Sequence, residues 1–154
     1  MNDRLVLYEI DSAIDILSDI VEVKRSRNLG HAPTIHKWIT VKTGARVALW
    51  GQVTGHPERI EQDVMTSPLF YIDPETGFAR TRSRWYWLDK PLRDENDLAH
   101  EAMVFGPDSV EVPLEEALSV TRTIPNLLLI EVEILGDEHR SERVREIQKQ
   151  LLNY

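Results

Sequence analysis

The chain has 154 residues, no cysteine and a formal net charge of −8 at pH 7. The length suits one domain with a sizeable hydrophobic core, and hydrophobic and charged fractions of 42% and 29% are typical of a soluble globular protein. The absence of cysteine excludes a disulfide framework, a thiolate nucleophile and a cysteine-based zinc site.

The negative charge is concentrated in the C-terminal part of the chain. Residues 91–154 carry 14 acidic and 6 basic side chains, whereas residues 1–90 carry 12 of each. This balance argues against general nucleic-acid binding, because phosphate neutralisation by Lys and Arg supplies most of that affinity. It favours an acidic surface that meets a basic partner.

Targeting segments are not evident in the sequence. No stretch has the composition of a signal peptide, and no apolar run approaches the ~20 residues that a membrane-spanning helix needs. The sequence therefore predicts a cytoplasmic protein that makes no contact with a membrane.

The first predicted element is an amphipathic helix from about Asp3 to Arg27. Its apolar residues follow a 3-4-3-4 spacing. They are Leu7, Ile10, Ile14, Leu17 and Val21. Asp3 can cap the start of the helix, and Gly30 can end it. The apolar stripe is short and favours packing on a sheet, although a homodimer formed through this helix remains open.

Three or four antiparallel strands are predicted between His36 and Leu88. His36 to Val41 can form a short strand, and Arg46 to Thr54 alternates with the period of two that is typical of a strand with one buried face. Val64 to Ile72 is a second apolar run, in which Pro68 marks an edge position or a bulge because proline cannot donate to a strand ladder.

The strongest local signal is the segment Asp73-Pro74-Glu75-Thr76-Gly77, which predicts a tight hairpin turn. The return strand is expected to run without a break from Phe78 to Leu88. Its even positions would place Arg80, Arg82 and Arg84 on one face, about 6.6–6.8 Å apart. Three like charges in a row need counter-charges or an anionic ligand.

Two interpretations of this arginine row are open. The first is a ladder of ion pairs on a solvated face, and the candidate partners are Glu58, Glu61, Asp63 and Glu75. The second is a binding site for an anion or an acidic partner. Trp50, on the polar side of its strand, and Tyr86 would extend that site. Trp85 and Trp87 share the opposite face and are expected in the core.

Four short motifs lie close together in this region. They are Gly55-His56-Pro57, Thr66-Ser67-Pro68-Leu69, Asp73 to Gly77, and Ala79-Arg80-Thr81-Arg82-Ser83-Arg84-Trp85-Tyr86. The combination resembles a small proteobacterial family of unknown function that occurs in chromosomes and on mobile elements. The resemblance covers roughly residues 33–88, and it implies no activity, cofactor or catalytic residue.

The C-terminal third is predicted to alternate between helices and strands. A helix should begin at Pro113 and end at Pro125. Asn126 to Leu135 alternates apolar and polar side chains in its second half and predicts a strand. A final helix should follow, with Asp137 or Ser141 as its N-cap.

These elements predict an α+β fold in a single domain over residues 1–154. The expected core is an antiparallel meander sheet of three to five strands at about 36–88, with N-terminal, middle and C-terminal helices packed on it. An acidic α/β part would occupy about 91–154, and it would include a short helix over 97–103 and a short strand over 110–112.

No catalytic, metal-binding or cofactor-binding motif is present. The five histidines do not form an H-E-x-x-H pattern, and no serine lies in a G-x-S-x-G elbow. His56 is the histidine of most interest, because a Gly-His-Pro turn beside the basic strand could present its ring to solvent. It could equally be a turn histidine that bonds a nearby carbonyl. We therefore expect no metal and no cofactor.

The sequence favours a non-catalytic binding or regulatory protein with a protein or nucleoprotein partner. The expected binding residues are Arg80, Arg82, Arg84, Tyr86, Trp50 and His56. A sharper hypothesis is a mobile-element inhibitor of the anti-CRISPR or anti-defence type. The alternative is an enzyme acting on a small anionic substrate, in which the three arginines form a clamp and His56 is the acid or base. Both interpretations of the arginines require the segment from Phe78 onward to be one extended strand.

Overall fold

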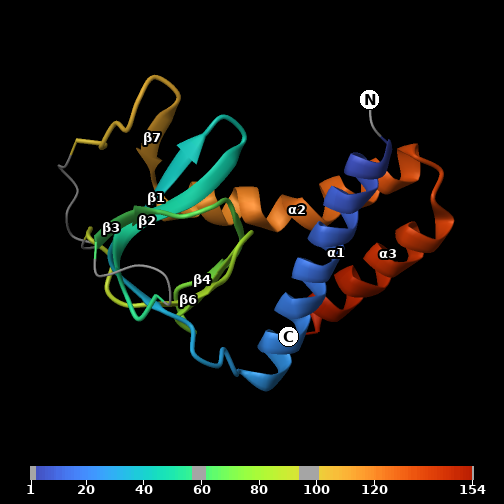
Figure 1. Ribbon diagram of the computed structural model, residues 1–154, viewed down its shortest axis with the longest axis horizontal. Helices are drawn as coiled ribbons and strands as arrows, with labels where there is room; N and C mark the ends of the chain where they lie inside the picture. The colour runs from blue at the N-terminus through green and yellow to red at the C-terminus, as the bar shows by residue number, and fades with distance from the viewer. Residues whose placement is uncertain (1–2, 57–61, 94–100, 154) are drawn as a thin grey trace. The chain divides into compact units, whose positions relative to one another are not determined.

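The computed structural model describes residues 3–56, 62–93 and 101–153, and in these it has three helices and a mixed sheet of seven strands. The predicted α+β class is confirmed. The chain forms two compact units: a sheet unit, residues 29–122, and a helical unit, residues 1–28 with 123–154 (Figure 1). The assignment of all 154 residues to a single domain stays a prediction.

The strands all belong to the sheet unit. They are β1 (Thr34–Thr43), β2 (Arg46–Thr54), β3 (Gln62–Met65), β4 (Leu69–Asp73), β5 (Phe78–Thr81), β6 (Trp85–Leu88) and β7 (Ser109–Val112). They are ordered β3-β2-β1-β6-β5-β4, and β7 also pairs with β1. The strands predicted near residues 36–41, 46–54 and 110–112 are confirmed, as is the hairpin turn between β4 and β5.

The long strand β1 organises this sheet. It pairs with β2 along one edge, while its other edge pairs first with β6 and then, from Thr40 to Thr43, with β7. The β1–β6 pairing is parallel, so the prediction of a purely antiparallel meander of three to five strands is wrong. The reason lies in the path of the chain, which leaves one edge of β1 through β2 and returns to the other edge through β6.

The two ends of the strand order are joined by a very short link. Six strands in a flat sheet would place β3 and β4 about 24 Å apart, whereas the chain from Met65 to Leu69 can reach only about 14 Å. The sheet must therefore curl, and Figure 1 shows β4 and β6 across from β1, β2 and β3. Thr66 fastens the link to β2: its N–H donates to Leu49 O at 2.8 Å, and its Oγ1 accepts from Leu49 N at 3.0 Å.

The curled sheet encloses the main hydrophobic cluster. Its buried members are Ile35, Trp38, Val47, Leu49, Val53, Val64, Leu69, Ile72, Ala79, Tyr86 and Ala117. Ala117 comes from α2 (Leu114–Ile134), and Leu114, Leu118 and Val120 of the same helix pack against the cluster. The first half of α2 thus belongs to the core of the sheet unit.

The predicted strand from Phe78 to Leu88 is wrong, because the chain reverses in its middle. β5 ends at Thr81, β6 begins at Trp85, and the two strands pair antiparallel. The side chain of Thr81 holds the turn. Its Oγ1 accepts from the N–H groups of Ser83 and Arg84, each at 3.2 Å, and donates to Arg84 O at 3.1 Å. A threonine hydroxyl is able to close a turn in this way without Gly or Pro.

The strand predicted over Asn126 to Leu135 is also wrong, because α2 continues through Pro125 to Ile134. Proline removes one helical hydrogen bond and usually ends a helix. Here the helix buries Leu128 and Val132, which are four residues apart and therefore share one face. Burial of that face stabilises the helical conformation beyond the proline.

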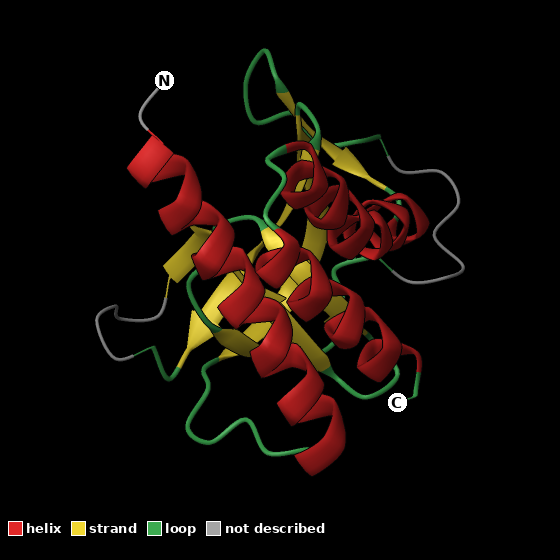
Figure 2. Cartoon of the chain, turned by 90° about the vertical axis from the view of Figure 1, so that its right-hand side faces the viewer, coloured by secondary structure: helices red, strands yellow, loops and turns green. Residues whose placement is uncertain are grey.

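The helical unit contains α1 (Asp3–Ser26), the second half of α2 and α3 (Glu138–Leu152). Both terminal helices were predicted, and Asp137 is the N-cap of α3, where its side chain accepts from Arg140 N at 3.1 Å. α1 and α3 lie side by side (Figures 1 and 2). Their buried apolar residues are Ile10, Ile14, Ile16, Leu17, Ile20, Val23, Val144 and Ile147.

Some predictions fall on residues outside the described ranges. These include most of the helix expected over 97–103, although residues 101–103 are not helical. The proposed counter-charges Glu58 and Glu61 and the proline of the Gly-His-Pro motif also lie outside the described residues. Within the described residues, no helix has the length and apolar character that crossing a membrane requires.

Candidate functional site

The three predicted arginines do not form a row. Arg80 lies on β5 with Tyr71 and Trp85 as its cross-strand neighbours, whereas Arg82 and Arg84 belong to the turn that Thr81 closes. Their predicted alignment required one continuous strand, and that strand is interrupted by the turn. Arg82 is exposed, and Arg80 and Arg84 are half-buried. Whether any of them binds a partner stays a prediction.

The aromatic residues near this turn are distributed differently from the prediction. Tyr86 points into the core of the sheet unit and is buried, so its ring is not a surface group. Trp85 is buried as expected, but Trp87 is partly exposed. Trp85 and Trp87 were predicted on the face opposite Phe78 and Arg80. The turn instead places them on the same face, because Phe78 pairs with Trp87 and Arg80 pairs with Trp85.

The aromatic rings form a continuous group across β4, β5 and β6. Phe78 contacts Trp87 with ring centroids 5.1 Å apart and Trp85 at 6.5 Å, and Tyr71 lies 6.2 Å from Trp85. These edge-on arrangements are the favoured geometry for aromatic pairs. They indicate that the face shared by Phe78 and Trp85 is a packed structural layer.

The other two predicted binding residues are half-buried. Trp50 on β2 packs against Phe105, with ring centroids 5.6 Å apart. His56 follows the end of β2 directly after Gly55. The ring contact of Trp50 is with Phe105 and not with the arginine turn. The role of Trp50 and His56 in binding stays a prediction.

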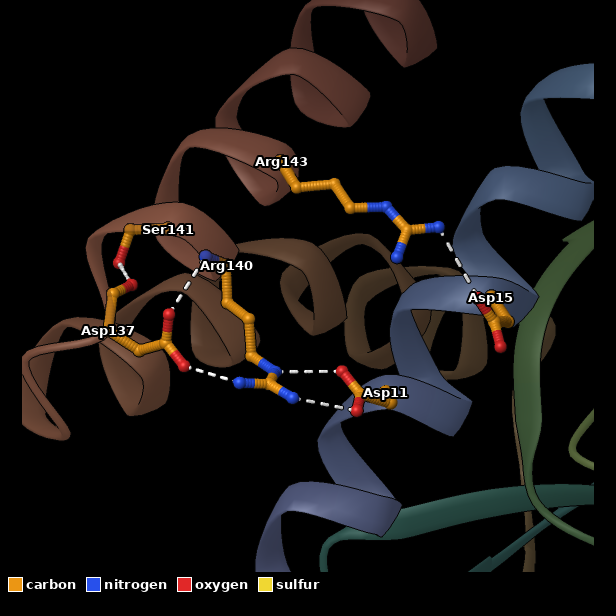
Figure 3. Close-up of polar contacts among 6 residues, drawn as sticks. All are labelled: Asp11, Asp15, Asp137, Arg140, Ser141 and Arg143. Atoms are coloured by element: carbon orange, nitrogen blue, oxygen red, sulfur yellow. Dashed lines mark hydrogen bonds and ion pairs between the residues drawn. The ribbon is translucent and has the colours of Figure 1, made fainter.

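A polar network joins α3 to α1 in the helical unit (Figure 3). The Nε and Nη2 atoms of Arg140 donate to the two carboxylate oxygens of Asp11, each at 2.8 Å, and its Nη1 donates to Asp137 at 2.5 Å. The hydrogen bonds from the Arg140 guanidinium hold the pKa of Asp11 below the ordinary aspartate value, and hydrogen bonds from the Arg140 backbone N–H and guanidinium lower the pKa of Asp137. The network is a structural link between two helices, because each of its charged groups is paired with a group of opposite charge in the network.

We predict that Arg140→Met lowers the urea midpoint of unfolding at pH 7. The lowered pKa values mean that ionised Asp11 and Asp137 stabilise the folded state above the ordinary value of 3.8, and that this contribution is lost as the pH falls through the folded values. The difference between variant and wild type should therefore shrink as the pH falls below 3.8. The control is Arg143→Met, which removes only a 3.3 Å contact with exposed Asp15. An equal loss in both variants would contradict the prediction.

The most distinctive surface of the helical unit is an apolar stripe on the second half of α2. Leu127, Ile130 and Ile134 are 59%, 45% and 80% exposed. Their i, i+3, i+7 spacing places them on one side of the helix, opposite Leu128 and Val132, which are buried. We call these three residues the α2 stripe. A helix that is apolar on both sides normally has both sides covered.

Acidic residues border the α2 stripe. Glu131 is four residues after Leu127 and three before Ile134, so it flanks one side of the stripe. Glu133 is three residues after Ile130 and flanks the other side, where it accepts a 2.9 Å hydrogen bond from Arg145. The surface is thus a short apolar strip with a negative edge at Glu131 and with the ion pair of Glu133 and Arg145 at its other edge.

The α2 stripe was not predicted, because the sequence pattern of residues 126–135 was interpreted as a strand. Ile130, Val132 and Ile134 also fit the period of two, and Pro125 was expected to end the helix. The available signal was the apolar run Leu127-Leu128-Leu129-Ile130, which fits a helix with two apolar faces as well as it fits a strand.

The fold is that of a small α+β protein with an exposed apolar surface on a helix. Among the described residues, no cluster of acidic or histidine side chains could hold a metal. The chain belongs to the family described as "family of unknown function (DUF6634)", which matches residues 9–132. That range contains the whole of the segment 33–88 on which the resemblance rested. No curated protein and no solved structure matches the chain.

Proposed function

We propose that this protein binds a partner protein through the α2 stripe, and that the partner presents a basic amphipathic segment. The observation that carries the proposal is the exposure of Leu127, Ile130 and Ile134 on the face of α2 opposite its buried face. Contiguous exposed apolar groups with a polar border are characteristic of protein interaction sites.

The charge around the α2 stripe selects the kind of partner. Glu131 and Glu133 edge the apolar side chains, and the whole chain carries a net charge of −8. Lys or Arg side chains on either side of an apolar ridge would complement this arrangement and would speed the encounter. A segment with acidic borders would be repelled.

A second copy of the chain fits this surface less well. Glu131 lies near the middle of the interval from Leu127 to Ile134. Two α2 helices packed through their stripes would therefore bring two Glu131 carboxylates close to the symmetry axis, and like charges at such positions destabilise the pair. The charge pattern thus favours a different, basic partner.

The proposed binding is compatible with the inhibitor hypothesis drawn from the sequence. A mobile-element inhibitor of the anti-CRISPR or anti-defence type would use an acidic surface against a basic nucleic-acid channel of a nucleoprotein. The stripe adds apolar anchor residues to that acidic surface, and such anchors supply most of the affinity in protein interfaces. Capture of a nucleoprotein through the α2 stripe would support this finer form of the proposal.

The proposal is tested with a synthetic amphipathic peptide made of Leu and Lys, labelled for fluorescence anisotropy. We expect the wild type to bind it, and the triple variant Leu127→Ser, Ile130→Ser, Ile134→Ser to bind at least roughly tenfold more weakly, because it loses the apolar anchors. Glu131→Lys should also weaken binding through charge repulsion.

Two controls accompany this measurement. Leu152→Ser changes an exposed leucine at the end of α3, outside the stripe, and should leave the affinity unchanged. A peptide of the same pattern with Glu in place of Lys should not bind. Equal affinity of the wild type and the triple variant, or equal binding of the two peptides, would disprove the proposed function.

A further inference from the structure

A separate polar cluster in the sheet unit joins three strand segments. His36 lies on β1, Thr54 ends β2, and Asp89 follows β6. The Nδ1 atom of His36 is 2.7 Å from Asp89 Oδ2, and its Nε2 atom is 2.8 Å from Thr54 Oγ1. One imidazole ring thus bridges a carboxylate and a hydroxyl through its two nitrogens.

The sheet register fixes the positions of these groups. Thr34 on β1 lies opposite Thr54, which places the hydroxyl two residues from His36 along the paired strand. On the other edge of β1, the Asp89 N–H donates to Ile35 O at 2.9 Å. Backbone hydrogen bonds on both edges of β1 therefore hold the hydroxyl and the carboxylate on either side of the imidazole.

The Asp89 carboxylate determines which ring nitrogen carries the hydrogen. An ionised carboxylate only accepts, so His36 Nδ1 is the donor, and this hydrogen bond with His36 holds the pKa of Asp89 below its ordinary value. In the neutral ring Nε2 is then an acceptor, and the Thr54 hydroxyl donates to it. This is the ground-state arrangement of a nucleophile, a general base and an orienting carboxylate.

The cluster is accessible to small molecules. The side chains of His36 and Asp89 expose 31% and 51% of their surface. Thr54 itself is half-buried. An exposed site offers little stabilisation of a developing oxyanion, so suitable substrates are small acyl esters with a good leaving group.

We propose that Thr54, His36 and Asp89 form a catalytic triad that hydrolyses small activated acyl esters. Thr54 Oγ1 attacks the carbonyl carbon while its proton passes to His36 Nε2. The tetrahedral intermediate then collapses, the bond to the leaving alkoxide breaks, and His36 returns the proton to it. Water, deprotonated by His36, then attacks the acyl-threonine. The bond between the acyl carbon and Thr54 Oγ1 breaks, His36 returns the proton to Oγ1, and the carboxylic acid is released.

The test uses p-nitrophenyl acetate with the full chain. We expect release of p-nitrophenol above the background of the free ester, and an acetyl group located on Thr54 by mass spectrometry of the digested protein. Thr54→Ser should retain activity, whereas Thr54→Val, which has the same shape without the hydroxyl, should lose it. His36→Asn should lower the rate by about 100-fold through loss of the base.

The variant Asp89→Asn tests the positioning carboxylate. It replaces a carboxylate that can only accept with an amide that can also donate to Nδ1, so the tautomer with Nε2 free of hydrogen is no longer enforced. The rate should therefore fall and its dependence on pH should change, while the circular dichroism spectrum stays the same. A wild type that carries no acetyl group on Thr54 would overturn the triad whatever the stability of the variants. Equal rates for Thr54→Val and the wild type would also overturn it.

Discussion

Gly51→Ala is expected to lower the free energy of unfolding by about 3 kcal/mol, the upper part of the range for overpacked sites. A Cβ atom at this position of β2 would lie 2.8 Å from His36 O, 2.9 Å from Ile35 Cγ1 and 3.1 Å from Trp38 Cα. Two of these three atoms belong to the backbone, so a side-chain rotation cannot remove the conflict.

The close approach has a local cause. β1 changes register between His36 and Ile39, and Lys37 in that bulge has a φ angle of 48°. The bulge presses the β1 backbone against β2 at Gly51. Any side chain at position 51 would therefore force β1 and β2 apart.

Gly44→Ala provides the matched control, measured in the same urea titration. Gly44 has a φ angle of 60°, and a Cβ atom added there would meet no described atom within 4 Å, so alanine introduces backbone strain alone. That strain should cost about 1–2 kcal/mol. Gly51→Ala losing no more stability than Gly44→Ala would contradict the clash.

Arg93→Met is expected to destabilise the sheet unit by about 3 kcal/mol, the lower end of the range for breaking a buried ion pair. Arg93 donates through Nε and Nη2 to the two carboxylate oxygens of Glu111, at 3.0 and 2.9 Å. The Glu111 side chain is only 6% exposed, whereas that of Arg93 is 27% exposed. Removing the arginine takes the two hydrogen bonds from its guanidinium away from a buried carboxylate.

A double-mutant cycle separates the pair from its surroundings. Glu111 also accepts from Met103 N at 3.0 Å, so Glu111→Leu alone leaves that N–H without this acceptor. The double variant Arg93→Met, Glu111→Leu should be more stable than Arg93→Met alone, because it no longer buries a carboxylate that has lost its guanidinium partner. Chemical unfolding of the wild type, the two single variants and the double variant gives the coupling free energy. A coupling near zero would show that Arg93 and Glu111 contribute independently to stability.

The candidate surfaces were only partly visible in the sequence. The alternation of residues from Phe78 to Leu88 predicted Arg80, Arg82 and Arg84 on one face, but their alignment depended on one strand that the structure divides. The α2 stripe depended on assigning residues 126–134 to a helix. The triad of His36, Thr54 and Asp89 has no sequence motif, because the three residues come from segments that meet only through strand pairing.

Several helices, strands and turns were predicted correctly from short-range sequence patterns. The 3-4-3-4 apolar spacing predicted α1, the period of two predicted β2, and the Asp-Pro-Glu-Thr-Gly segment predicted the β4–β5 turn. The sequence offered Asp137 or Ser141 as the N-cap of α3, and the structure has Asp137 there. In each case neighbouring side chains and backbone groups alone account for the conformation, because capping, turn formation and amphipathic patterning act over a few residues.

Other elements depend on contacts between residues far apart in the chain, and for these the local sequence pattern was not sufficient. The Thr81 hydroxyl closes a turn where the alternation of residues predicts a continuous strand, and Thr81 itself is fully buried. α2 passes through Pro125 because Leu128 and Val132 are buried beyond it. β1 pairs in parallel with β6 because the short link between β3 and β4 curls the sheet. Burial and strand pairing act between residues far apart in the chain, and they outweigh local preference where the two disagree.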